Sequence, residues 1–207
     1  MSKADVALAL RHTKEFLVAA NLDPQVLGGA GTGKVLSLLD ASARRTTDEL
    51  RRGVRTPSRT HDPLIYISRF DPSEAELVGK AVKVRGRMTF EAGEPGQVLV
   101  HADYSFVYPV VPVHGDGQRV HRVVVRRGIT MLSADPNRWR TSPGKLQLTS
   151  TESEFMNVEC GGHGYFHPVF DGTAHSGPKP TGDPFDPYDR GRKLSVEDGA
   201  CSAITRS

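Results

Sequence analysis

The segment VLVHADYSFVYPV, residues 98–110, carries two side chains that could exchange protons. Alternation along a strand places His101 and Asp103 on the same face, about 7 Å apart. An imidazole and a carboxylate at this distance could act as acid and base in the pocket of a curved sheet. The simpler interpretation, which we prefer, places both on the solvated face of an antiparallel sheet. His101 and Asp103 are therefore kept only as candidate catalytic residues.

A second group of chemically active side chains follows near the C-terminus. Cys160, His163 and His167 have a spacing that zinc could use, but structural zinc sites usually carry more cysteines and the intervening glycines supply no rigid geometry. The simpler alternative is a disulfide, because Cys160 and Cys201 are the two cysteines of the chain and both lie in segments rich in Gly, Pro and Asp. An oxidised Cys160 could not bind a metal ion.

We therefore predict a disulfide between Cys160 and Cys201 and no metal site. The bond would close a loop of about 40 residues and stabilise the fold by roughly 4 kcal/mol in the chain-entropy model. Such a bond favours an oxidising compartment, and two free thiols in a cytosolic protein are the alternative.

Residues 28–35 read GGAGTGKV, which is close to a nucleotide-binding P-loop. Val35 stands where a P-loop has the Ser or Thr that holds Mg²⁺. Pro24 and a helical segment precede the glycines, so no buried strand leads into them. We interpret the segment as a connection between two helices, and we expect no cofactor.

Composition restricts the partners. The chain has 207 residues, 27 of them Lys or Arg, and a net charge of +3. The basic residues are spread along the sequence, whereas nucleic-acid binding needs them on one face, so no nucleic acid is expected. The densest run, residues 44–59, is typical of a solvated helix end and linker. No segment approaches 18 apolar residues and no signal peptide is visible, although the sequence leaves open a membrane anchor before residue 1.

One basic surface is conceivable on the sheet. Arg85 and Arg87 would share a strand face, and Arg122 and Arg126 would lie on a strand nearby. Such a surface could meet an acidic envelope polymer or a partner protein. The more ordinary interpretation is a charged outer face that prevents strand pairing.

The elements that must position these residues form an α+β pattern of N-terminal helices packed on a curved antiparallel sheet. Apolar spacing predicts a helix over 4–20 and a second over 34–52, and the polar segment 53–63 reads as a linker. DPSEAELVG, residues 71–79, is expected to form a turn or one helical turn. Short turns between apolar alternating runs predict a meander of strands. The predicted strands are residues 64–70, 82–90, 98–110, 119–132 and 145–155.

We predict one domain with an appended segment. Residues 1–157 form the α+β domain, with helices in 4–52 and the sheet in 64–157. Residues 158–207 form an extended C-terminal tail with little regular structure, which the predicted disulfide staples to the same domain.

The segments FVYPV, HPVF and DPYDR occur here together with NVECG and Cys201. In this combination the chain resembles a group of uncharacterised exported or membrane-anchored proteins of streptomycetes and related actinobacteria, over most of residues 64–207. The order of helices and strands is similar to the nuclear transport factor 2-like, or cystatin-like, cone. The resemblance implies an extracytoplasmic location and brings no activity with it.

Together these observations favour a non-enzymatic extracytoplasmic domain that binds a protein or cell-envelope partner. The alternative is a small-molecule-binding or lyase/isomerase-type domain with a cone-shaped pocket at His101 and Asp103. The two hypotheses differ in whether His101 faces an enclosed apolar pocket or open solvent.

Overall fold

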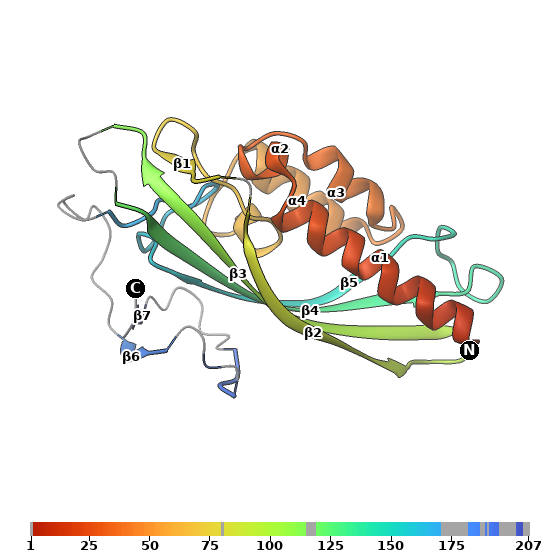
Figure 1. Ribbon diagram of the computed structural model, residues 1–207. Helices are drawn as coiled ribbons and strands as arrows, with labels where there is room; N and C mark the ends of the chain where they lie inside the picture. The colour runs from red at the N-terminus through yellow and green to blue at the C-terminus, as the bar shows by residue number, and fades with distance from the viewer. Residues whose placement is uncertain are drawn as a thin grey trace.

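The computed structural model describes residues 2–79, 81–114, 119–170, 182–186, 189, 191–194 and 202–204. Helices from the first quarter of the chain lie on one face of a curved, five-stranded antiparallel sheet (Figure 1). The predicted α+β class, with N-terminal helices on an antiparallel sheet, is therefore confirmed.

The longest helix, α1 (Lys3–Asn21), lies across the sheet and confirms the helix predicted over 4–20. It begins with a capping box, in which the Asp5 amide donates to Ser2 Oγ (3.2 Å) and the Ser2 amide donates to Asp5 Oδ2 (2.7 Å). Its buried face follows the helical repeat through Ala9, Phe16 and Ala20. A short helix, α2 (Pro24–Leu27), follows.

The single helix predicted over 34–52 is wrong. The structure has two helices, α3 (Thr32–Leu38) and α4 (Arg44–Arg55), and α4 extends into the predicted linker. The chain breaks between them because tertiary contacts override helix propensity. Leu39 makes a parallel β-bridge with Leu146, and the side chain of Asp40 turns inward to accept hydrogen bonds.

The strand predicted over 64–70 is also wrong. Residues Pro63–Ile65 form a 3₁₀ turn, η1, and Leu64, Ile67 and Phe70 are buried. Apolar residues at every third position reflect core packing of a turn and not the alternation of a strand. The expected turn lies at residues 72–74, and the first strand, β1 (Ala75–Leu77), follows within the same segment.

The four longer predicted strands are confirmed. They are β2 (Lys83–Ala92), β3 (Gln97–Pro112), β4 (His121–Ala134) and β5 (Gln147–Met156). All pairs are antiparallel in the order β1–β3–β4–β5, and β2 pairs with β3 on the same side as β1. Alternation along β3 buries Val100, Ala102, Phe106 and Tyr108 beneath the helices, as the sequence predicts.

The C-terminal segment contains more regular structure than the sequence predicts. Strands β6 (Gly182–Phe185) and β7 (Ser202–Ile204) pair in parallel as a separate two-stranded sheet. Its described residues also contact the face of the large sheet that lies opposite the helices. Leu194 Cδ1 lies 2.6 Å from where a Cβ on Gly128 would be, so the missing side chain makes room for the leucine.

Candidate functional site

The two candidate catalytic residues lie on the outer face of the sheet, opposite the helices, and each has its own partners. His101 Nδ1 lies 3.0 Å from Thr130 Oγ1, and its Nε2 lies 3.0 Å from Glu91 Oε1. The histidine side chain is 42% exposed. His101 is therefore held on an exposed sheet surface between two polar neighbours.

Asp103 instead takes part in a two-pronged ion pair. Its carboxylate oxygens accept from Arg126 Nε (3.1 Å) and Nη2 (3.0 Å), and this hydrogen bonding raises the pKa of Arg126. Arg126 Nη1 donates to the carbonyl oxygen of Arg192 at 2.7 Å, and Arg192 in turn pairs with Glu154. Asp103 thus orients an arginine that fastens the C-terminal segment.

This arrangement removes Arg126 from the basic sheet surface that was one of two interpretations of the sequence. Arg126 is only 4% exposed, because residues of the C-terminal segment lie over it. Its charge is matched by Asp103 and is not presented to a partner.

The space beneath the helices, where a cone-shaped pocket would lie, is filled by a polar network. The Tyr108 hydroxyl, fully buried, donates to the Asn21 carbonyl (3.0 Å) and approaches Ser68 Oγ (2.9 Å). Arg127, 1% exposed, donates to Asn21 Oδ1 (2.7 Å) and Ser153 Oγ (2.9 Å). Burial lowers the pKa of Arg127 to about 10, so the side chain stays cationic at neutral pH.

The two histidines of the zinc alternative are held by different carboxylates. His163 Nδ1 lies 3.4 Å from Asp62 Oδ2, and His167 Nδ1 lies 2.6 Å from Glu74 Oε2. Within the part of the chain that the structure describes, no three His, Cys, Asp or Glu residues are grouped so as to hold a metal ion. Cys201, half of the predicted disulfide with Cys160, lies outside the described residues, so that disulfide stays a prediction.

The glycine-rich segment is the expected connection between helices, running from the end of α2 to the start of α3. Gly29 has φ +89°, and a Cβ there would lie 2.7 Å from the Tyr165 hydroxyl oxygen. Tyr165 also stacks under the guanidinium of Arg69, 4.2 Å from the ring centroid. The glycine therefore serves close packing, and Lys34 pairs with Asp23 at 3.2 Å.

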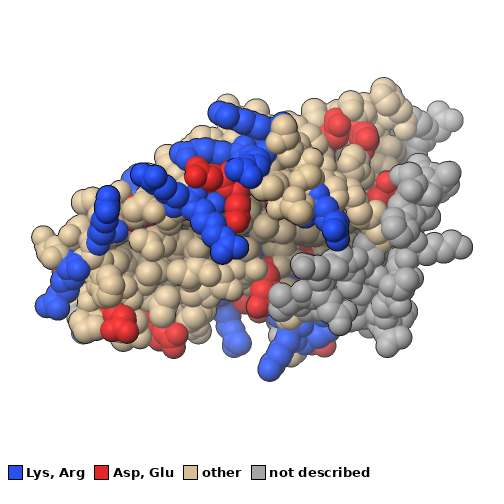
Figure 2. All heavy atoms as spheres, turned by 180° about the vertical axis from the view of Figure 1, so that it is seen from behind, with Lys and Arg blue, Asp and Glu red and all other residues tan. Residues whose placement is uncertain are grey.

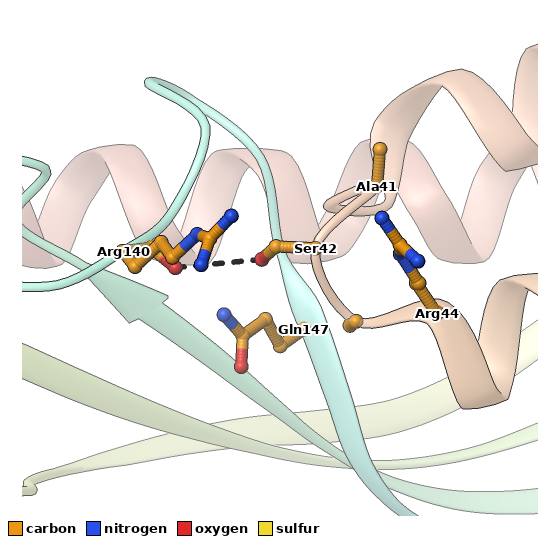
Figure 3. A pocket seen from close by; sticks show the side chains of 6 residues that line it. Ala41, Ser42, Arg44, Arg140 and Gln147 are labelled. Atoms are coloured by element: carbon orange, nitrogen blue, oxygen red, sulfur yellow. Dashed lines mark hydrogen bonds between the residues drawn. The ribbon is translucent and has the colours of Figure 1, made fainter.

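A hollow of about 760 Å³ opens where the helical layer meets the β4–β5 connection (Figure 3). The α3–α4 connection and α4 approach from one side, and the β4–β5 connection and β5 from the other. Ser42 Oγ joins the two sides through a hydrogen bond to the Arg140 carbonyl at 3.4 Å. The lining residues are Ala41, Ser42, Ala43, Arg44, Arg140 and Gln147.

Asp40 supports this hollow from inside. Its carboxylate is fully buried and accepts from the backbone amides of Ser42 (2.8 Å) and Ser142 (3.1 Å). The Thr141 and Ser142 hydroxyls and the Gln147 amide also donate to it. Burial raises the pKa of Asp40, but these hydrogen bonds outweigh burial and hold the pKa well below the usual range of a carboxyl group.

The arginines around the hollow differ in their partners. Arg45 pairs with Glu49 (3.1 Å) and Arg51 with Asp48 (3.3 Å). Arg44 and Arg140 have no carboxylate partner among the described residues. Asp40 is already saturated with donors, so it does not neutralise them by direct contact.

The backbone adds positive potential at the same place. Ala43, the residue before α4, offers no side-chain oxygen to the first amides of the helix, whereas Ser2 and Asp23 cap α1 and α2. Uncapped amides at a helix start favour a nearby anion. The hollow is therefore suited to an anionic group. In the sequence, its Arg44 belongs to the basic run at 44–59, which we interpreted as a solvated helix end and linker.

The comparisons with known proteins give no relative: no family model, no curated protein and no solved structure matches the chain. The resemblance to exported actinobacterial proteins and to the nuclear transport factor 2-like cone thus stays a prediction. Among the described residues, no helix combines the length and the apolar character that crossing a membrane requires.

Proposed function

We propose that the chain is a non-enzymatic extracytoplasmic domain that binds an anionic component of the cell envelope through its arginine surface. The observation that supports this most directly is the pair Arg44 and Arg140. They border one hollow from two sides, and neither has a carboxylate partner among the described residues.

The exposed face of α4 extends this positive surface. Arg44, Arg51 and Arg55 are seven and four residues apart, which places them within about 40° of one another around the helix, although Arg51 also pairs with Asp48 at 3.3 Å. Along the axis they are separated by about 10 Å and about 6 Å. Figure 2 shows Lys and Arg side chains gathered across the upper part of the rear face, with some Asp and Glu among them. Such a row suits a polymer with repeated negative charges better than a single small anion.

The lyase/isomerase alternative receives less support from the geometry. His101 lies on the exposed outer face, Asp103 is occupied by Arg126, and Tyr108 and Arg127 fill the space beneath the helices. The site therefore offers binding groups rather than an acid and a base around a shared substrate.

The proposal also includes the extracytoplasmic location of the domain and its classification as a nuclear transport factor 2-like cone. A curved sheet with helices on one face is compatible with a nuclear transport factor 2-like cone. The extracytoplasmic location depends on the resemblance and on the predicted Cys160–Cys201 bond. Thiol titration of the unfolded chain before and after reduction tests it: no free thiol before and two after are expected, and two free thiols before reduction would refute it.

Binding of the full chain to poly-L-glutamate and to polyphosphate tests the ligand class. We expect Arg44→Ala/Arg140→Ala to weaken binding at least about tenfold, because charge-assisted hydrogen bonds contribute about 1.5–3 kcal/mol each. A matched control, Arg11→Ala/Lys14→Ala, removes the same charge from exposed positions on α1 and should change affinity less than about threefold.

The two polymers distinguish carboxylate from phosphate recognition, and duplex DNA of equal charge serves as a comparison. Failure of both polymers to bind, or equal losses in the two double variants, would refute recognition at the hollow. If the chain bound an acidic protein and neither polymer, an envelope polymer would also be ruled out as the partner.

A further inference from the structure

Strand β2 forms a long, exposed margin of the sheet (Figure 1). It pairs with β3 along Lys83–Ala92, and no other strand of the described residues pairs with it. Alternate amide and carbonyl groups of β2 therefore point away from β3. Such an edge is a template for another strand unless charges or bulges block it.

The helix-side face of β2 is apolar but poorly covered. Val84 and Phe90 lie opposite the buried Phe106 and Val100 of β3, so they share the core face of the sheet. Nevertheless Val84 is 42% and Phe90 52% exposed. An added strand would extend the covered core over both side chains.

The opposite face of β2 carries charges in an order that complements itself. Lys83, Arg85 and Arg87 occupy its first half, and Glu91 lies near its end. A two-fold axis through Met88, perpendicular to the sheet, would create two identical pairs. In each pair, Arg85 of one copy would lie opposite Glu91 of the other. No like charges would then lie opposite one another, because Arg87 would face Thr89. On the core face the same axis would place Phe90 opposite Gly86.

We propose that two copies of this chain associate by antiparallel pairing of their β2 strands, in the register centred on Met88. Nine residues of each strand, 84–92, pair in this register. Gly86 already accommodates an aromatic ring within the chain, since a Cβ there would lie 2.3 Å from the Tyr104 ring. Phe90 of the second copy would approach the same glycine from the open edge of β2, opposite to β3 and Tyr104.

Other registers fit less well. Centring on Arg87 places two arginines opposite each other, and centring on Gly86 places Arg85 opposite Arg87. Centring on Thr89 avoids this but pairs only residues 86–92, leaving Val84 uncovered. A shift by one residue between the two strands turns apolar side chains toward the charged face. The self-complementary order of charged and apolar residues is what favours a second copy over an unrelated strand.

Sedimentation equilibrium of the full chain tests the association. We expect a concentration-dependent mass that reaches twice 22.5 kDa. Phe90→Lys should weaken dimerisation about tenfold, because it removes the Phe90–Gly86 cross-strand contact twice in the symmetric dimer and places a charge on the core face. Val18→Lys is the matched control, since Val18 is 41% exposed on α1, and it should leave the dimer unchanged.

A charge exchange tests the register. Arg85→Glu and Glu91→Arg each place like charges opposite one another and should give monomers, with far-UV circular dichroism unchanged. An equimolar mixture restores two opposite pairs only in the Met88-centred register, so a heterodimer should form. A monomer at every concentration would overturn the dimer, and single variants that dimerise as well as the wild type or a mixture that stays monomeric would overturn the register.

Discussion

Replacing Asp40 tests whether the hollow depends on a buried, ionised carboxylate. Five donors converge on this side chain from the α3–α4 connection, the β4–β5 connection and the start of β5. In Asp40→Asn one oxygen remains, and the new NH₂ group faces groups that also donate. A hydrogen bond to a charged group contributes about 1.5–3 kcal/mol, and Thr141 and Gln147 can reorient in part. We therefore expect a loss of about 2–3 kcal/mol in the free energy of unfolding at neutral pH.

The pH dependence distinguishes an ionised Asp40 from a merely well-packed one. Its folded-state pKa is depressed, so its stabilisation is present above the unfolded-state pKa of about 4 and is lost as pH falls below that value. The variant cannot titrate at this position. The stability difference between wild type and Asp40→Asn should accordingly be constant from pH 7 to about pH 5 and shrink progressively below about pH 4.

Urea denaturation at pH 7, 5 and 3.5, followed by circular dichroism, measures this difference directly. At neutral pH the melting temperature should also fall by roughly 4–12 °C, from about 2–4 °C per kcal/mol in a domain of this size. Asp48→Asn is the control, because Asp48 is exposed on α4, and its effect should stay within about 0.5 kcal/mol. Equal stability of wild type and Asp40→Asn at pH 7, or a difference that persists unchanged at pH 3.5, would refute the reasoning.

Three further substitutions test other parts of the structure. Gly29→Ala introduces a Cβ at positive φ and against Tyr165, and should destabilise the fold by more than about 1 kcal/mol in urea denaturation; a neutral effect would contradict the packing described. Tyr108→Phe removes a buried hydroxyl from the Asn21 carbonyl and should cost about 1–3 kcal/mol in the same assay, whereas less than about 0.5 kcal/mol would mean that the network is not needed. Arg126→Met removes the donor to the Arg192 carbonyl, so amide hydrogen exchange in residues 191–194 should accelerate while that of β3 stays slow; unchanged exchange in 191–194 would show that Arg126 does not fasten the segment.

The sequence predicted a helix or strand correctly where its apolar residues followed a single helical or alternating repeat. Residues 4–20 carry an uninterrupted helical pattern, and residues 98–110 alternate cleanly, so α1 and β3 could be predicted together with the side of the sheet that His101 faces. Residues 64–70 failed because a segment of seven residues, five of them apolar, fits a strand and a buried turn equally well. Periodicity alone does not separate the two.

The hollow could not be predicted for a different reason. Asp40 interrupts a helical pattern only because Thr141, Ser142 and Gln147 reach it, and these residues are about a hundred positions away in the sequence. Arg44 and Arg140 are separated in the same way. Local patterns describe which residues are basic, but only the folded chain determines which basic residues border the same space and which are neutralised by a neighbour.

The contact of residues 189 and 191–194 with the outer face of β4 has a consequence for assembly. Many antiparallel sheets of this size associate by stacking one layer on another, about 10 Å apart. Here the Leu194 side chain lies over Gly128, and the Asp189 and Arg192 carbonyl groups lie against Arg126. Layer-on-layer stacking at β4 is thereby hindered, whereas the proposed β2 dimer would extend the sheet sideways, along the hydrogen-bonding direction of the strands.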